Sequence, residues 1–133
     1  MLNPDRALYY RLGGYEAIAA FCDELLSRLT KDSILAVYWK GKCDDSMRKD
    51  RQLLVDFLCM ITGGPVNYSG RDMKTSHTGL GINEAEWNIF AQHAIAVLND
   101  LGVPEAEKEE VLSLAASFKG DVVEMAAHRK ATY

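Results

Sequence analysis

Apolar residues recur at intervals of three and four along four stretches of the chain, with polar residues between them. This spacing puts the apolar side chains on one face of an α-helix. The first stretch, residues 15–29, follows the turn Gly13-Gly14, and the second, residues 47–62, ends at two glycines and Pro65, where a helix cannot continue. The third begins after Asn83, and the fourth begins at Pro104. The pattern therefore predicts four amphipathic helices.

Capping signals support the last two helices. Asn83 and Glu86 have the spacing of a capping box, in which each side chain accepts a hydrogen bond from the backbone of the other residue. We expect one face of this helix to point inward, formed by Trp87, Phe90, Ala91, Ala94, Ile95 and Leu98. The fourth helix carries several glutamates near its start, which suit the positive end of the helix dipole. Gly120 interrupts its apolar pattern, so a bend or close packing is expected there.

Shorter segments are expected between these helices. Residues 4–12 are interpreted as a short helix with Pro4 in its first turn, residues 34–39 as a compact helical turn, and residues 41–51 as a polar loop that runs into the second helix. The sequence shows no convincing alternation of apolar and polar residues of the kind typical of strands. We therefore predict an all-α fold in a single domain, residues 1–133, with a four-helix bundle as the simplest architecture.

Charge and composition narrow the function classes. The formal net charge is −4, and the nearest basic cluster, Arg48, Lys49 and Arg51, has acidic neighbours. We interpret it as solvated surface and expect no nucleic-acid partner. The N-terminus lacks the layout of a signal peptide, and no apolar run approaches the ~18 residues that span a bilayer. No membrane association and a cytoplasmic location are expected.

The three cysteines show no CxxC spacing, which argues against a disulfide framework and against a zinc site. Cys22 and Cys59 lie on apolar helix faces and are expected in the core as small hydrophobic residues. Cys43 lies between Lys42 and Asp44 and is expected to be exposed.

His77 is the histidine with a candidate chemical role. It is one of three histidines and lies in a polar stretch with glycines at 79 and 81, ahead of the third helix. On spacing alone, a solvated or hydrogen-bonded histidine is the commoner outcome for such a position. His93, in the middle of the third helix, is expected to be structural, and His128 lies near the C-terminus.

The chain resembles the group I truncated haemoglobins in three ordered segments, LYYRLGGYEAI, FLCMITGGPVNYSGRDMKTSHTGLGI and GVPEAEKEEV. The likeness extends from residue 8 to residue 123. It implies a shortened globin fold, with two helices packed over two and haem between them, which accommodates the four predicted helices. It also implies haem b (iron protoporphyrin IX) as the cofactor and His77 as the proximal ligand of its iron. A neutral imidazole suits that role.

The resemblance implies supporting residues around the haem. Trp39 stands where the family usually has a phenylalanine stacked on the haem edge, and indole can take that place. We expect Leu54, Phe57 and Met73 to form the wall of the haem cavity. We expect Lys74, with Arg71 or Tyr68, to pair with the haem propionates. Simple core packing is an alternative for Leu54 and Phe57, and a solvated surface lysine is an alternative for Lys74.

The sequence departs from the family on the distal side, where a gas ligand binds. Many members stabilise bound oxygen with a tyrosine on the second helix and a glutamine on the distal helix. Alignment from the glycine turns puts Leu26 and Leu54 at these places, so both donors are missing. Weaker oxygen retention and faster oxidation to ferric haem are expected.

The sixth coordination position of the iron is left open by the sequence. No histidine precedes His77, so an internal ligand would have to be Lys49, Met47 or Gln52, with water or an open site as the alternative. The segment before Pro65 is longer than the family pattern, which leaves the start of the distal helix open as well. Tyr38 is interpreted as a structural tyrosine.

The resemblance implies diatomic gases as ligands (O₂, NO and CO), with reversible oxygen binding or transport. It also implies oxidation of nitric oxide to nitrate, a nitric oxide dioxygenase activity, with a reductase as partner. One alternative is haem-based redox or peroxidase-like work, or gas sensing, with an internal sixth ligand. Another is a helical module that binds no haem.

Overall fold

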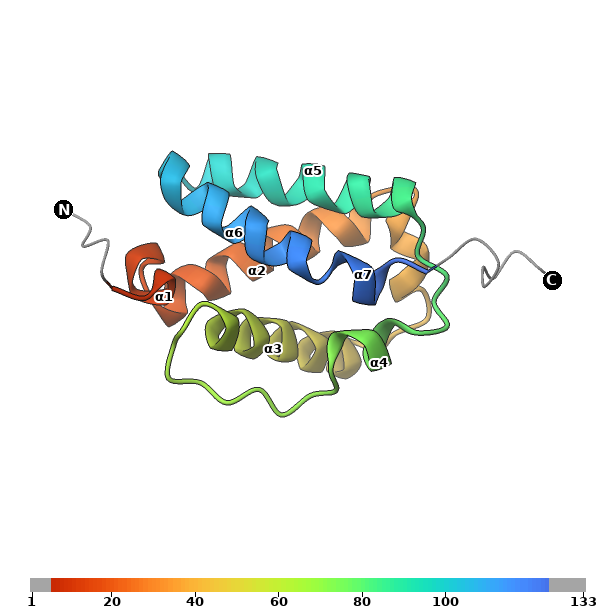
Figure 1. Cartoon of the computed structure of the whole chain (residues 1–133). Coiled ribbons are helices and arrows are strands. Elements are labelled where there is room, and N and C mark those ends of the chain that lie inside the picture. Colours follow the sequence, from red (N-terminus) through yellow and green to blue (C-terminus); the bar gives the residue numbers. More distant parts are fainter. Residues whose placement is uncertain (1–5, 125–133) are drawn as a thin grey trace.

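The computed structural model describes residues 6–124, and over that range all regular structure is helical, which confirms the all-α prediction. Its elements are α1 (Leu8–Leu12), α2 (Tyr15–Lys31), the 3-10 helix η1 (Leu35–Trp39), α3 (Asp44–Ile61), α4 (Met73–His77), α5 (Glu84–Asp100), α6 (Glu105–Ser117) and α7 (Lys119–Val122). Helix α2 packs against α3 and α5, and α5 packs against α6 (Figure 1). Two long helices thus lie over two others. No helix in the described range is long and apolar enough to cross a membrane.

Helix α3 begins earlier than predicted. It starts at Asp44, so the expectation of a polar loop through residue 51 is wrong for most of that segment. Asp44 and Asp45 lie in the first turn, where acidic side chains interact favourably with the positive end of the helix dipole. The polar residues mark the exposed face of the helix, and one of them, Arg51, pairs with Asp23 of α2 at 2.8 Å. The compact turn predicted at residues 34–39 is confirmed as η1.

Helix α5 has the predicted capping box. Asn83 accepts a hydrogen bond from the backbone N–H of Glu86 at 2.8 Å, and Glu86 accepts one from the backbone N–H of Asn83 at 3.0 Å. Its inward face differs at one position, because Ile95 is 38% exposed whereas Val97 is 1% exposed. The face that contacts α2 follows Ala94, Val97 and Leu98. Ile95 lies about 100° around the helix from Ala94 and turns to solvent.

The chain bends where the fourth predicted helix passes Phe118. Helix α6 ends at Ser117 and α7 begins at Lys119, so the expected bend is confirmed just before Gly120. A Cβ atom at Gly120 would meet nothing within 4 Å, so the alternative of close packing at this glycine is wrong. At the other end of the chain, α1 is confirmed only as Leu8–Leu12, and Pro4 lies outside the described residues.

Two apolar clusters hold the long helices together. The first joins α1, α2 and α3 through Tyr9, Ile18, Cys22, Val55 and Cys59. The second joins α2, η1 and α5 through Leu25, Leu29, Leu35, Ala94 and Val97. Both core cysteines are buried and Cys43 is exposed, as predicted. These clusters fix α3 and η1 relative to α2.

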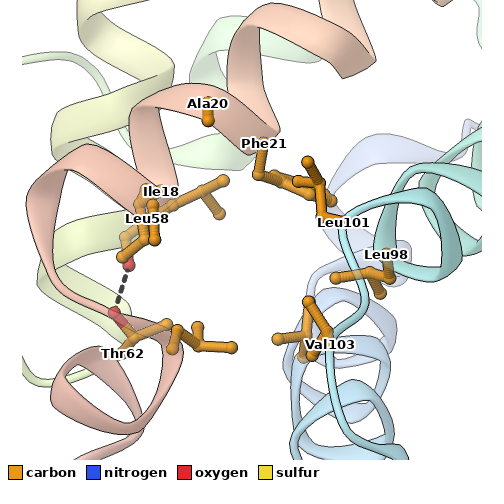
Figure 2. A pocket seen from close by; sticks show the side chains of 11 residues that line it. Ile18, Ala20, Phe21, Leu58, Thr62, Leu98, Leu101 and Val103 are labelled. Atoms are coloured by element: carbon orange, nitrogen blue, oxygen red, sulfur yellow. Dashed lines mark hydrogen bonds between the residues drawn. The ribbon is translucent and has the colours of Figure 1, made fainter.

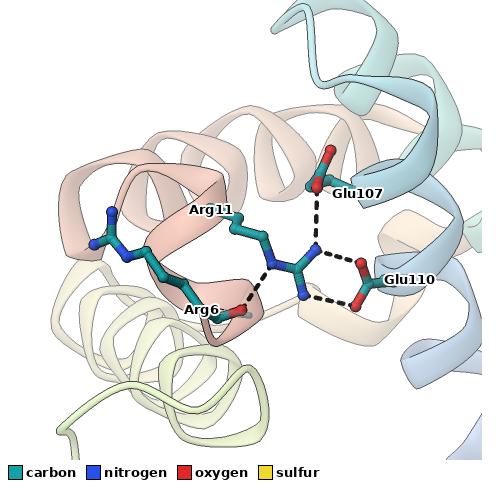
Figure 3. Close-up of polar contacts among 4 residues, drawn as sticks. All are labelled: Arg6, Arg11, Glu107 and Glu110. Carbon is teal, nitrogen blue, oxygen red and sulfur yellow. Dashed lines mark hydrogen bonds and ion pairs between the residues drawn. The ribbon is translucent and has the colours of Figure 1, made fainter. Parts of the chain in front are cut away.

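An ion-pair network ties α1 to α6 (Figure 3). The Arg11 guanidinium donates to Glu107 at 3.0 Å and, in a two-pronged contact, to Glu110 at 2.9 Å through Nη2. Its Nε donates to the Arg6 carbonyl at 2.8 Å. Arg11 holds the pKa of the Glu110 carboxyl below its ordinary value through these hydrogen bonds. Glu107, expected only as a first-turn acid, is buried and docks the N-terminal helix.

Candidate functional site

His77 is the last residue of the short helix α4. The helix begins because the Asp72 carboxylate accepts the backbone N–H of Thr75 at 2.6 Å. Hydrogen bonds from the side chain and the backbone of Thr75 lower the pKa of Asp72. After His77 the chain turns through Gly79 (φ 92°) and Gly81 (φ 72°). Positive φ angles of this kind favour glycine at both positions. Helix α4 therefore presents His77 from its C-terminal end.

The hydrogen bonds of the His77 ring define its tautomer. Nδ1 lies 2.8 Å from the Met73 carbonyl oxygen, which can only accept, so Nδ1 carries the proton. The Ser76 hydroxyl lies 3.0 Å from Nδ1 and donates to the same carbonyl at 3.2 Å. In the neutral ring Nε2 then holds a lone pair. A carbonyl on Nδ1 with Nε2 as the coordinating atom is the usual arrangement of a metal-ligating histidine.

A single imidazole of this kind suits a metal whose other ligands come from a macrocycle. Within residues 6–124 there is no group of three or more His, Cys, Asp or Glu side chains that could hold a metal ion. Iron in haem takes four nitrogens from the porphyrin and an axial ligand from the protein. The donor at His77 therefore fits haem.

Phe57 connects α3 to the segments that flank α4. It is 8% exposed, and its ring lies edge-on to Tyr68 and to Phe118, with centroids 5.2 Å apart in each pair. Tyr68 belongs to the loop between α3 and α4, and Phe118 lies between α6 and α7. The sequence predicted Phe57 and Tyr68 as site residues, and Phe118 was not among them. The missing information was the contact itself, since these aromatic residues are far apart in the chain.

The predicted propionate partners differ in their surroundings. The Tyr68 hydroxyl donates to the Arg71 carbonyl at 2.5 Å, and burial raises the pKa of Tyr68. This hydroxyl therefore stabilises its own loop. Lys74 and Arg71 have exposed side chains, and Met73 is half-buried. A contact of Lys74 or Arg71 with a propionate stays a prediction.

The other predicted wall residues lie against the core clusters. Trp39 packs against the cluster of α2, η1 and α5, and Leu54 packs against the cluster of α1, α2 and α3. Leu26 is half-buried on α2. These positions agree with core packing, and contact of the three side chains with haem stays a prediction.

The candidates for an internal sixth ligand are placed differently from one another. Gln52 donates to the Tyr15 hydroxyl at 2.9 Å and to Asp56 at 2.9 Å, so its amide is held on the outer side of α2 and α3. Lys49 is exposed, and Met47 is half-buried near the start of α3. The amide of Gln52 would have to leave both partners before it could reach a metal.

Two further polar residues have structural roles. His93 Nε2 lies 2.8 Å from the Asp32 carboxylate, which agrees with its interpretation as structural. This hydrogen bond, with the backbone N–H groups of Leu35 and Ile34, lowers the pKa of Asp32. Tyr38 donates to the buried Glu86 at 2.7 Å, which agrees with the expectation of a structural tyrosine. His128 lies outside the described residues.

An apolar pocket of about 200 Å³ lies elsewhere, between α2, α3 and the link from α5 to α6. Figure 2 shows side chains from these segments around it, among them Ile18, Phe21 and Val103. The Thr62 hydroxyl in its wall donates to the Leu58 carbonyl at 2.7 Å, which leaves an apolar lining. None of the predicted site residues lines this pocket, so it is separate from the site at His77.

Comparisons with known proteins show the family and the fold of this chain. A family model described as bacterial-like globin matches residues 7–124. The chain is 34% identical over 116 residues to group 1 truncated hemoglobin GlbN of Nostoc sp., covering 87% of this chain and 96% of that protein. It is 31% identical over 122 residues to GlbN of Synechocystis sp., again with 87% and 96% covered. The solved Fe(III) truncated hemoglobin of Tetrahymena pyriformis superimposes with a TM-score of 0.82 at 24% identity, covering 90% of this chain and 100% of that one, which shows the shared fold.

The helical sandwich and the match to the family model identify a globin, a class of haem protein that binds diatomic gases. More narrowly, this chain belongs to the bacterial-like globin family and, within it, to the group I truncated haemoglobins with the two-over-two fold.

Proposed function

We propose that this chain holds haem b through Nε2 of His77 and binds O₂, NO and CO at the iron. The observation that carries the proposal is the hydrogen bond from His77 Nδ1 to the Met73 carbonyl at 2.8 Å, which leaves Nε2 as the coordinating atom. The relatives named as truncated hemoglobins support the same cofactor and ligand class.

The residues of the chain would hold the cofactor in three ways. Met73 and Ser76 fix the orientation of the His77 ring through their contacts with Nδ1. The apolar side chains of Trp39, Leu54, Phe57 and Met73 exclude water from the macrocycle, and Leu26 faces the ligand without a donor group. Lys74 and Arg71, whose side chains are exposed, pair with the propionates at the solvent edge. The bound haem supplies the redox-active iron that coordinates the gas.

The proposal extends to a nitric oxide dioxygenase reaction, in which nitric oxide and dioxygen give nitrate. That conversion consumes one electron per turnover, so a reductase is the expected partner. Leu26 and Leu54 offer bound oxygen no hydrogen bond, and each missing bond is worth about 0.5–1.5 kcal/mol. Oxygen should therefore dissociate faster from this protein than from a relative with tyrosine and glutamine at these places.

Titration of the purified protein with hemin tests the proposal. We expect a Soret band that saturates at one haem per chain, followed by a shift when the ferrous form is exposed to carbon monoxide. No Soret absorption after hemin addition would contradict the proposal and favour a helical module without haem. A six-coordinate, low-spin ferric spectrum would instead favour the redox or sensing alternative with an internal ligand.

A further inference from the structure

The turn that follows His77 is held by a carboxylate from the end of the described chain. Oε1 of Glu124 accepts the backbone N–H of Gly79 at 3.0 Å and the backbone N–H of Gly81 at 2.6 Å. The backbone N–H of Glu124 in turn donates to the Ile82 carbonyl at 2.8 Å. Three hydrogen bonds therefore join residue 124 to residues 79–82, and the first donor lies two positions after His77.

This turn needs an external hold because of its composition. Gly79 and Gly81 have positive φ angles of 92° and 72°, and glycine has more backbone conformations to lose on ordering than any other residue. Hydrogen bonds from N–H groups to a charged acceptor are stronger than bonds between neutral groups. The Glu124 carboxylate therefore stabilises one conformation of the turn that follows the C-terminal end of α4.

Helix α7 carries Glu124 to this position. It packs against α4 (Figure 1). Its Val122 is buried. Just before α7, Phe118 lies edge-on to Phe57 of α3 with ring centroids 5.2 Å apart. The C-terminal segment thus contacts the distal helix through Phe118 and the turn after His77 through Glu124.

We propose that Glu124 is a positioning residue for the proximal ligand: by fixing the turn of residues 79–82 it sets the tilt of the His77 imidazole and the strength of the bond from Nε2 to iron. The inference rests on the proposed function, since it requires His77 to be that ligand. Residues that orient a ligand from outside its coordination shell typically change metal affinity or activity by about 10–100-fold when removed.

The test compares Glu124→Ala with Glu124→Gln in the haem-loaded, full-length protein. The alanine variant removes the acceptor for both N–H groups, so we expect its iron–imidazole stretching band in the ferrous state to broaden and move to lower frequency. We expect its haem to transfer to an acceptor apoglobin about 10-fold faster than in wild type. The glutamine variant keeps an oxygen at the same place and should restore the band position.

Asp121→Ala is the matched control, because Asp121 lies on the same helix α7 with an exposed side chain. It should leave the band and the transfer rate at their wild-type values. If Glu124→Ala does not fold, Glu124→Asp decides, since it keeps the charge and withdraws the carboxylate by one methylene.

An iron–imidazole band that is unchanged in Glu124→Ala, or in Glu124→Asp, would overturn the inference even if the protein were less stable. A band that is shifted equally by Asp121→Ala would also overturn it, because the effect would then belong to α7 in general. If the wild-type protein takes up no haem, the proposed function itself fails. That result is distinct from normal haem binding with an insensitive band.

Discussion

Replacing Phe57 with leucine tests how much the packing of α3 against the segments around His77 stabilises the protein. Leucine keeps an apolar side chain at this position, which is 8% exposed, but removes the edge-on contacts with Tyr68 and Phe118, each at 5.2 Å. Such a contact is worth about 0.5–1.5 kcal/mol beyond area burial, so the two together give about 1–3 kcal/mol. For a domain of this size that loss lowers the melting temperature by roughly 4 °C per kcal/mol, or about 4–12 °C.

The assays are thermal unfolding, for the melting temperature, and urea unfolding, for the free energy, both followed by circular dichroism at the same hemin concentration for each variant. Met60→Leu is the control, since Met60 lies on the same helix and is 41% exposed; it should stay within about 0.5 kcal/mol of wild type. A double-mutant cycle with Phe118→Leu should show coupling of about 0.5–1.5 kcal/mol. If Phe57→Leu unfolds within about 0.5 kcal/mol of wild type, or if the cycle shows no coupling, the packing argument is wrong.

Three further predictions concern the fold. Gly64→Ala should destabilise the protein, because the added Cβ would lie 2.4 Å from the Tyr9 ring, whereas Gly120→Ala should be neutral or stabilising by up to about 1 kcal/mol in urea unfolding. A thiol reagent should modify Cys43 quickly and the buried Cys22 and Cys59 only on unfolding. Burial raises the pKa of Cys22 to about 12, which disfavours its reactive thiolate. Three fast-reacting thiols would contradict the burial of Cys22 and Cys59. The His93 hydrogen bond lowers the pKa of Asp32 in the folded state, so wild type should be more stable than Asp32→Asn. This difference in stability should be full above the ordinary pKa of 3.8 and should shrink as pH falls below it. A difference that does not change with pH would contradict this.

The long helices could be predicted from the sequence because their signals are local. Periodicity identified the four amphipathic segments, and the capping box is formed by Asn83 and Glu86, the two residues from which it was predicted. Errors arose where tertiary contacts decide. The start of α3 was masked by its polar residues, which form an exposed face, and Ile95 was assigned inward because its apolar character does not reveal which face α2 covers.

The part of the site that lies in one continuous motif could be predicted from the sequence. His77 and its flanking glycines lie within a few residues of each other, and the resemblance gave the histidine a role. Glu124 and Phe118 carry no such signal, because the contact from Glu124 to Gly79 spans 45 positions and exists only once α7 packs against α4. The ion pairs of Arg11 could not be predicted from the sequence either, since its partners on α6 lie 96 and 99 positions away.

The central claim is that His77 is the proximal ligand of the haem iron, and the most direct measurement is the iron–imidazole stretching band of the ferrous protein. In His77→Ala the band should vanish, although haem can remain through burial of its apolar face, worth about 25 cal/mol per Å². In His93→Ala the band should persist, because the His93 ring is bonded to Asp32 at 2.8 Å. A band that survives in His77→Ala and disappears in His93→Ala would contradict the assignment of the site.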